Sequence, residues 1–267
     1  MAEPTWPQAA LLLAGHGLAA RPEGALSTLR HAEALRARGL FADVRAGFLR
    51  QEPELAATLA ELTQPRVYVV PMLASKGYIA DVVMARRLNL EGPVTWRPAA
   101  GGGQELCFCE PVGAHPRIPA LLGERVAALC RRQKLAPAAT EVILVGHGTP
   151  RHPSSSERTR EVADMIAKTG IAARVRAMFL DEEPRIDGWK EQSQAGNVIV
   201  APFLIANWYH GSQDLPGRLG LLTQAGEAAP SLIDGRRLWY MSPLGEEPEI
   251  ADLALAMVEK FDAERAM

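Results

Sequence analysis

Histidine and carboxylate side chains stand at three places in the C-terminal half of this 267-residue sequence where they could bind a metal ion or move a proton. His147 lies within Gly-His-Gly after an apolar run, Asp181 and Glu182 follow a second run, and His210 lies in PFLIANWYHGSQDLP. Imidazole suits Co, Ni, Fe and Zn, and neutral imidazole accepts a proton near pH 7. Each of these residues could also be present without a chemical role, because most loop histidines are solvated and acids are favoured at the first turn of a helix.

The motifs that carry these residues occur twice, at nearly constant spacing. His16 lies in Gly-His-Gly as His147 does, and the two are 131 residues apart. Two further pairs of segments match at the same spacing, GFLRQEP with MFLDEEP and VYVVPML with VIVAPFL. Repeats of this kind indicate a duplicated structural unit. We therefore predict two lobes, 1–134 and 140–267, joined near the Ala/Pro-rich segment LAPAAT.

Each half alternates apolar or β-branched runs with amphipathic stretches such as EGALSTLRHAEALRARG. Strands that alternate with helices predict a parallel sheet covered on both faces. We expect two flavodoxin-like lobes, each a three-layer α/β/α unit with a parallel sheet. Ligands of such folds bind beyond the carboxyl ends of the strands. His147, after strand one, and His210, after strand three, are therefore expected to face one another.

Three motifs, taken in order, resemble those of the sirohydrochlorin chelatases of the CbiX/SirB type, and the resemblance extends over nearly the whole chain. The motifs are Gly-His-Gly, then Phe-Leu-acid with a nearby proline, and then Pro-x-x-Leu followed by His-x-x-x-Asp-Leu-Pro. The resemblance implies a class II chelatase, related to ferrochelatase, that inserts Co²⁺, Fe²⁺ or Ni²⁺ into a modified tetrapyrrole without ATP. It implies that His147 and His210 bind the metal and accept protons, with Asp181 as the intervening acid. Glu182 is a rival for that role, because the segment is one residue shorter than in the family. The metal is then a substrate, and no cofactor is bound permanently.

The first half departs from this pattern. His16 is kept, but Arg50 stands in the place of the acid and Ile79 in the place of His210. The first lobe therefore resembles one that lost its metal chemistry after duplication. His16 then has a structural role or lines a substrate cleft, and we favour the cleft.

A tetrapyrrole with several carboxylates needs cationic partners and flat surfaces. Candidates for the carboxylates are Arg50, Lys76 and Arg151, each of which is also explained as ordinary surface charge. Trp208 and Tyr209 either stack on the macrocycle or fill the core. These residues form the predicted substrate cleft, together with His16.

The composition of the chain limits which other classes of protein and which other kinds of site the sequence could represent. The net charge of −2 gives no basic field for nucleic acid, and no apolar run approaches the ~20 residues that span a bilayer. Cys107, Cys109 and Cys130 make neither a disulfide framework nor the four ligands of an iron–sulfur cluster, so we expect them in the core. We expect a cytoplasmic monomer that acts on a small-molecule tetrapyrrole. The main alternative is a non-catalytic protein that binds or delivers a tetrapyrrole or a metal.

Overall fold

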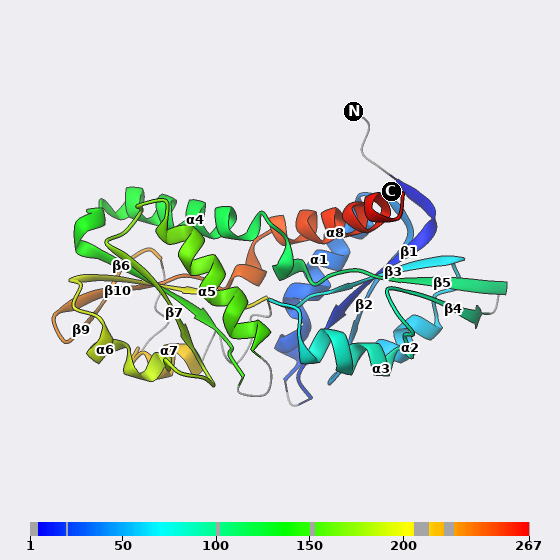
Figure 1. Cartoon of the computed structure of the whole chain (residues 1–267), viewed down its shortest axis with the longest axis horizontal. Coiled ribbons are helices and arrows are strands. Elements are labelled where there is room, and N and C mark those ends of the chain that lie inside the picture. The colour runs from blue at the N-terminus through cyan, green and yellow to red at the C-terminus, as the bar shows by residue number, and fades with distance from the viewer. Residues whose placement is uncertain are drawn as a thin grey trace. The chain divides into compact units, whose positions relative to one another are not determined.

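Two compact units make up the computed structural model (Figure 1). The described residues are 5–19, 21–99, 102–149, 153–205, 214–221 and 227–266. The first unit contains Met1–His115 and Glu247–Met267, and the second contains Pro116–Glu246. Each unit is built around its own five-stranded sheet.

The first sheet has the strand order β2-β1-β3-β5-β4, and the second has β7-β6-β8-β10-β9. The strands of the first sheet are β1 (Trp6–Gly15), β2 (Phe41–Phe48), β3 (Arg66–Pro71), β4 (Val94–Ala99) and β5 (Gly102–Phe108). Those of the second are β6 (Thr140–Gly146), β7 (Arg174–Phe179), β8 (Asn197–Pro202), β9 (Ser231–Ile233) and β10 (Arg236–Tyr240). The central strand β6 is buried along its whole length, as expected for a sheet between two helix layers.

The two sheets repeat each other in register. Ala10 of β1 pairs with Val67 of β3, and Glu141 of β6 pairs with Val198 of β8. Both residues of the second pair lie 131 positions after their counterparts. The predicted duplication and the predicted two-lobed α/β class are confirmed.

One edge of each sheet differs from the all-parallel prediction. β4 runs antiparallel to β5, and β9 runs antiparallel to β10. Asp234 and Gly235 join β9 to β10 with positive φ values of 49° and 77°, as a two-residue hairpin turn requires. A parallel connection needs a dozen or more residues, so a linker this short turns the chain back on itself.

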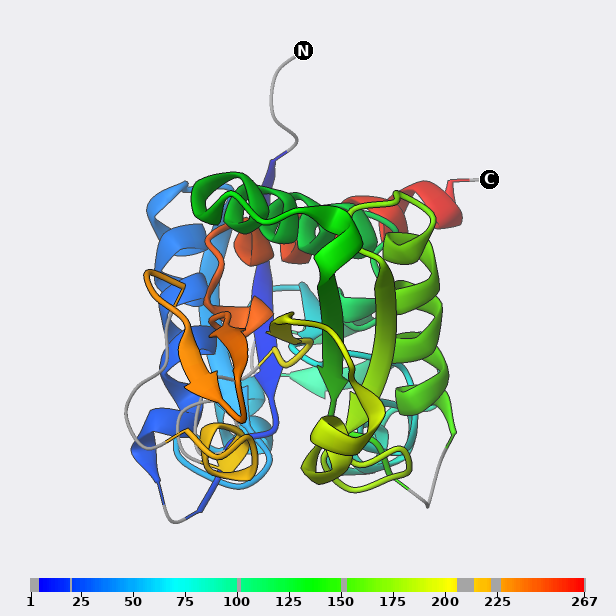
Figure 2. The same ribbon diagram turned by 90° about the vertical axis from the view of Figure 1, so that its left-hand side faces the viewer.

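Helices cover both faces of each sheet (Figure 1). In the first unit, α2 (Leu55–Ala60), α3 (Ala85–Arg87) and the π-helical turn Tyr78–Met84 pack on one face, and α1 (Leu26–Ala37) and α8 (Glu249–Arg265) lie on the other. In the second unit, α6 (Trp189–Gln192) and α7 (Leu215–Arg218) lie opposite α4 (Ile118–Gln133) and α5 (Ser154–Ala167). Figure 2 shows α5, in light green, running along the outside of β7.

The closing helix of each repeat belongs to the unit built on the other repeat's sheet. In chain order α4 follows β5 and is the counterpart of α8, yet it packs against α5 and β8. Likewise α8 follows β10 but packs against α1 and β3. The predicted boundaries 1–134 and 140–267 therefore follow the repeats, whereas the compact units exchange their closing helices. The two sheets have the same strand order and directions, so the repeat pattern alone does not say which sheet a closing helix covers.

Polar contacts fix α8 within the first unit. Asp262 accepts hydrogen bonds from Trp6 Nε1 at 2.8 Å and from the Tyr68 hydroxyl at 2.7 Å. Arg265 lies 2.8 Å from Glu105, a buried carboxylate of β5. Since a buried carboxylate is costly unless it is paired, α8 supplies charge balance as well as apolar surface.

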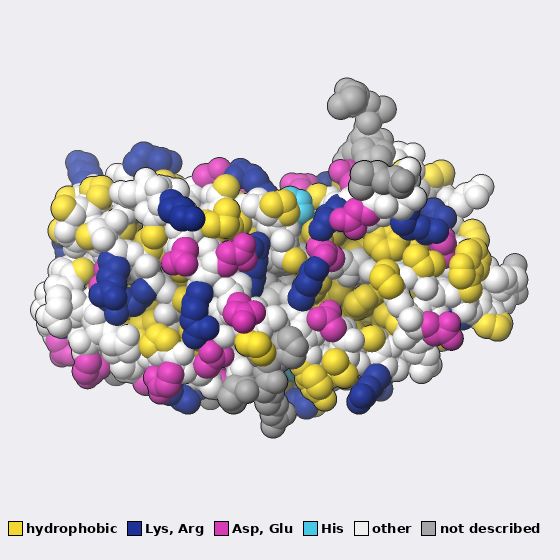
Figure 3. Space-filling view, viewed as in Figure 1, with side chains coloured by type: hydrophobic (Ala, Val, Ile, Leu, Met, Phe, Trp, Pro, Cys, Tyr) yellow, Lys and Arg dark blue, Asp and Glu magenta, His cyan; other side chains and the backbone are white. Residues whose placement is uncertain are grey.

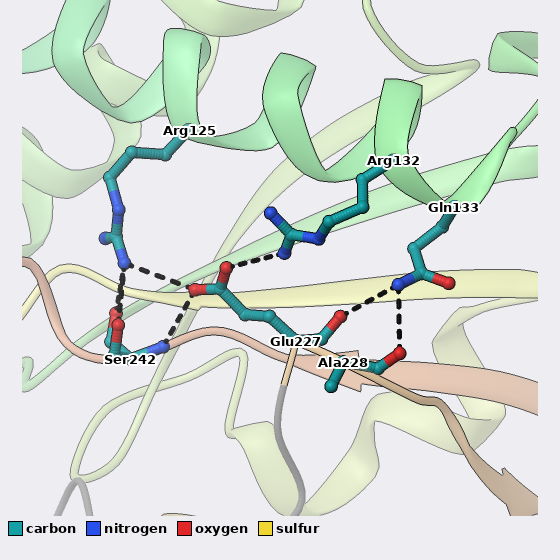
Figure 4. Close-up of polar contacts among 6 residues, drawn as sticks. All are labelled: Arg125, Arg132, Gln133, Glu227, Ala228 and Ser242. Carbon is teal, nitrogen blue, oxygen red and sulfur yellow. Dashed lines mark hydrogen bonds and ion pairs between the residues drawn. The ribbon is translucent and has the colours of Figure 1, made fainter.

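The helix α4 is fixed within the second unit by a separate set of contacts (Figure 4). Arg125 donates to the Ser242 carbonyl at 2.9 Å, and Arg132 lies 2.9 Å from the Glu227 carboxylate. Gln133 donates to the Glu227 carbonyl at 3.0 Å. These contacts hold α4 against the segments that lead into β9 and follow β10.

No helix among the described residues is long and apolar enough to cross a membrane. On the face shown in Figure 3, basic and acidic side chains are interspersed. This mixture fits the small net charge of −2.

Candidate metal and substrate site

The loops that follow β6 and β7 lie side by side at the carboxyl edge of the second sheet, because these strands are parallel neighbours. The carbonyl of His147 accepts hydrogen bonds from the Leu180 amide at 3.1 Å and the Asp181 amide at 3.0 Å. Two successive amides thus fix the backbone of the histidine against the acidic segment.

The side chains of His147 and Asp181 meet at this edge. His147 Nδ1 lies 3.6 Å from Asp181 Oδ2, and the two side chains are 49% and 47% exposed. Two donors that each lie about 2.1 Å from one tetrahedral ion are separated by about 3.4 Å, so this spacing suits a shared divalent ion. Nδ1 also lies 2.9 Å from the Gly148 carbonyl. That hydrogen bond requires a proton on Nδ1, and a metal bound there would replace it.

Glu182 has different partners from its neighbour Asp181. Its carboxylate accepts a hydrogen bond from the Thr149 amide at 3.2 Å and pairs with Arg160 of α5 at 3.1 Å. Partial burial acts to raise the pKa of Glu182, but hydrogen bonds from Ser156, Arg160 and the Thr149 amide outweigh it, and the pKa lies below its ordinary value. Glu182 therefore joins the histidine loop to α5.

The first repeat makes the same loop contact without an acid. Gln51, the counterpart of Glu182, accepts a hydrogen bond from the Leu18 amide at 2.8 Å. An uncharged amide therefore suffices to hold this loop. The comparison separates the two candidate acids, because Asp181 faces the histidine whereas Glu182 supports the loop.

Gly148 allows this close approach of the two loops. Its φ is +69°, and a Cβ there would lie 2.8 Å from the Cβ of Glu182 and 2.9 Å from that of Phe179. Gly17 has the same conformation, with φ +67° and equally close neighbours. The second glycine of each Gly-His-Gly is thus required because the loop that carries Glu182 in the second repeat, or Gln51 in the first, packs directly against it.

Arg218 of α7 is a residue at this site that the sequence analysis missed. It donates to the Leu180 carbonyl at 2.7 Å, pairs with Asp214 at 2.8 Å and lies 3.5 Å from Asp187. The hydrogen bond with Asp214 is the main reason why the pKa of this guanidinium is raised. The available signal was the repeat itself, since Arg87 stands 131 positions earlier.

Four predicted site residues lie outside the described residues, namely Arg151, Trp208, Tyr209 and His210. Within the described ranges, no group of three His, Cys, Asp or Glu side chains is placed to hold a metal ion. His147 and Asp181 are two donors of the predicted set, and His210 stays a prediction.

The first repeat preserves the backbone of the site but changes its side chains. The carbonyl of His16 accepts a hydrogen bond from the Arg50 amide at 3.0 Å, as His147 does from Asp181. Arg50 is exposed, and Ile79 is partly buried and packs against the apolar core of the first unit. An arginine and a core isoleucine thus occupy the places that an acid and a histidine have in the second repeat.

Lys76 forms an ion pair with Glu110, which also pairs with Lys260 of α8 at 2.5 Å. This cluster borders a cavity of about 520 Å³ that Phe108 and Met257 also line. The contacts give Lys76 a structural role in attaching α8. Its predicted role in binding substrate stays a prediction.

The three cysteines are buried and unbridged, as predicted. Burial raises the pKa of Cys107 to about 12 and that of Cys109 well above its ordinary value. Both groups therefore remain thiols, which fits core packing rather than metal binding.

The protein contains two α/β repeats, and each has a histidine-bearing loop after its first strand. It is therefore a duplicated protein in which the first copy has lost the acid and the second histidine of the site. The sequence model of the CbiX family matches residues 10–129 and again residues 141–260. The chain therefore belongs to the CbiX family.

Individual relatives cover the chain to different extents. A Halobacterium salinarum protein named probable sirohydrochlorin cobaltochelatase is 29% identical in an alignment 261 residues long, which covers 92% of this chain and 89% of that protein. A multi-domain Deinococcus radiodurans protein, described as structurally similar to chelatases with two additional domains, matches at 28% identity and a TM-score of 0.69. That match covers 93% of this chain and 54% of the other, so this chain spans about half of its length. A CbiX structure, described as the terminal enzyme of siroheme biosynthesis in denitrifying bacteria, shares the fold at 23% identity and a TM-score of 0.70, over 94% of this chain and 98% of that one.

Proposed function

We propose that this protein inserts a divalent metal ion, Co²⁺, Fe²⁺ or Ni²⁺, into sirohydrochlorin without ATP. The observation that carries the proposal is the approach of His147 to Asp181 at the carboxyl edge of the second sheet, in a chain of the CbiX family. The name of the Halobacterium salinarum relative supports sirohydrochlorin as the tetrapyrrole. Metal and tetrapyrrole are both substrates, and we propose no permanently bound cofactor.

In this proposal His147, His210 and Asp181 hold the ion. Few protein ligands leave positions for water, so the ion is surrendered to the macrocycle readily. The pyrrole nitrogens must lose their protons, and neutral imidazole accepts protons near pH 7. Asp181, beside His147, stabilises the imidazolium that results. We expect a monomer in the cytoplasm, and light scattering in solution tests the monomer.

An absorbance assay with sirohydrochlorin tests the function directly. Wild type, His147→Ala, His210→Ala and the control Ile79→Ala are compared with Co²⁺, Fe²⁺ and Ni²⁺, with and without ATP, after subtraction of spontaneous insertion. We expect insertion by the wild type without ATP, loss of more than 10-fold in both histidine variants, and little change in the control.

Two other outcomes decide against the proposal. A change of sirohydrochlorin spectrum on binding, without turnover for any of the three metals, identifies a carrier instead of an enzyme. Equal loss in the Ile79 and histidine variants, with all proteins folded, places the chemistry outside the second repeat.

A further inference from the structure

The first unit contains a cavity of about 520 Å³ that the proposed metal site does not use, and every residue that lines it belongs to this unit. Phe108, Met257 and Phe261 give the cavity an apolar wall. Acids outnumber cations among the charged side chains of the lining, which are Asp81, Glu91, Glu110, Glu264, Lys76 and Lys260. Both lysines pair with Glu110. The cavity is therefore apolar on one side and has a negative balance of charge.

The closing helices of the two units can be compared residue by residue. Leu129 of α4 and Phe261 of α8 are both buried, and they lie 132 positions apart. At the same spacing, Arg132 of α4 corresponds to Glu264 of α8. The helix that borders the cavity thus has an acid where its counterpart has a cation.

The segments that lead into the antiparallel edge strands also correspond. Thr95 of β4 and Ser231 of β9 hold equivalent places in the two sheet ladders. Glu91 stands four residues before Thr95, and Glu227 stands four residues before Ser231. Each of these segments therefore carries a glutamate at the same place.

The second unit closes this place with ion pairs (Figure 4). Arg132 lies 2.9 Å from the Glu227 carboxylate, and Arg125 lies 3.5 Å from it. In the first unit Glu264 takes the place of Arg132, and two carboxylates repel each other. Glu91 makes no ion pair with any residue in the described part of the chain. The first unit therefore keeps the acid of this pair and lacks its cation.

We propose that the cavity of the first unit binds a small organic cation, a guanidinium or ammonium group on an aliphatic stem. Glu91 and Glu264 bind the cationic head through charge-assisted hydrogen bonds, as Glu227 binds Arg132 in the second unit. The apolar wall contacts the stem, and its phenylalanine rings attract a cation.

The size and the chemistry of the cavity favour such a ligand over a bare metal ion. A volume of about 520 Å³ suits a small molecule. Within the described ranges, no three His, Cys, Asp or Glu side chains converge closely enough to hold a metal ion. Neither His147 nor Asp181 lines the cavity, so the inference goes beyond the proposed function and does not depend on it.

Methyl NMR measures binding at the cavity itself, because Met257 lines it. Butylguanidinium, butylammonium and the uncharged butylurea are titrated into wild type, Glu91→Gln/Glu264→Gln and the control Glu259→Gln. Glu259 is an exposed acid of α8 that does not line the cavity, and Met178 in the core of the second unit is the reference signal. We expect both cations to shift the Met257 signal saturably and to leave Met178 unchanged. Binding should be weaker by about 10-fold or more for butylurea, and for the cations in the double variant, with little change in the control.

Glu264→Arg is a second test, because it closes the cavity from within. An arginine at this position should pair with Glu91, as Arg132 pairs with Glu227, and should abolish binding of both cations. The Glu264 side chain is 56% exposed, so the variant should fold, which circular dichroism verifies.

Three results overturn the inference. The first is a Met257 signal that neither cation shifts saturably in the wild type. The second is butylurea that binds as tightly as the two cations, because the cavity then recognises the aliphatic stem alone. The third is cation binding that persists unchanged in the folded double variant or in the folded Glu264→Arg protein, because the cation then binds without these glutamates.

Discussion

Asp181 and Glu182 are neighbours in the sequence, yet their carboxylates have different surroundings. Asp181 lies 3.6 Å from the His147 ring, whereas Glu182 holds the Thr149 amide and Arg160. The first repeat keeps the supporting contact through Gln51 but replaces the other acid with Arg50. Both repeats keep the supporting contact to the loop, whereas a carboxylate beside the histidine occurs in the second repeat, which is why we propose Asp181 and not Glu182 as the acid that binds the metal.

This difference predicts unequal effects of removing each charge. Asp181→Asn should weaken Co²⁺ binding by about 10-fold or more, because it removes an ionised oxygen beside His147. Glu182→Gln should change binding by less than about 3-fold, because it recreates the contact that Gln51 makes. Isothermal titration calorimetry on both variants measures this, and a larger effect of Glu182→Gln would contradict our assignment.

Gly245 gives a prediction about stability rather than chemistry. A Cβ at this position would lie 1.6 Å from the Ile205 carbonyl oxygen. Gly245→Ala should therefore lower the free energy of unfolding by about 3 kcal/mol. Gly123 of α4 has nothing within 4 Å of its Cβ position, so Gly123→Ala should raise the free energy of unfolding by up to about 1 kcal/mol. Urea denaturation compares the two, and similar effects would show that the close approach is not present in solution.

At the level of elements, Arg218 connects the end of β7 to α7. Its counterpart Arg87 pairs with Glu54 instead, so the link to the acidic segment is specific to the second repeat. We predict that Arg218→Met weakens Co²⁺ binding by about 10-fold, because Leu180 and Asp214 lose their shared donor. Arg87→Met is the matched control and should leave metal affinity unchanged. Equal affinities of the two variants would remove Arg218 from the site.

Glu110 predicts how the attachment of α8 responds to acid. Partial burial acts to raise the pKa of Glu110, but Lys260 and Lys76 outweigh burial and hold it below its ordinary value. A lowered pKa contributes stability at neutral pH that is lost as the pH falls below about 4.5. Glu110→Gln should cost about 0.5–1 kcal/mol at pH 7. The difference from wild type should vanish near pH 3, as urea denaturation at both pH values can measure; a constant difference would show that the ion pairs contribute nothing.

Much of the order of strands and helices could be predicted from the sequence, and each feature that was missed has a definite physical cause. Motif spacing predicted the duplication, because a repeated backbone needs the same glycines and apolar runs at the same places. The antiparallel strands β4 and β9 were missed, although the Asp234-Gly235 pair is a hairpin signal. The exchange of α4 and α8 could not be predicted, because the apolar stripe of a helix does not identify which of two sheets with the same strand order it covers, and the polar contacts that decide this are visible only in the structure. At the site, the sequence could not distinguish Asp181 from Glu182, because their difference lies in contacts to Thr149 and Arg160.

For the whole molecule, the exchange means that the repeats are not the folding units. The contiguous segment 116–246 contains the complete second unit, whereas 140–267 lacks α4 and carries α8, which packs in the first unit. We predict that a fragment of residues 116–246 unfolds cooperatively as a monomer. A fragment of residues 140–267 should be less stable, or should self-associate.

Circular dichroism melts and light scattering on the two fragments test this prediction. The fragments are nearly equal in length, so a difference reflects the helices that they contain. A monomeric 140–267 fragment at least as stable as 116–246 would show that α8 can close the second sheet as well as α4 does.

The exchange of closing helices also sets an order of events during synthesis on the ribosome. Domains usually fold in the order in which they emerge, but here the unit that begins first is completed last. The sheet of the first unit is available once β5 has emerged, yet α8, which packs on it, is made about 140 residues later. At 5–20 residues per second, that wait lasts roughly 7–28 s. Throughout it, α1 covers its share of this sheet face, but the part that α8 will cover stays exposed on the nascent chain, and a chaperone could bind that apolar surface.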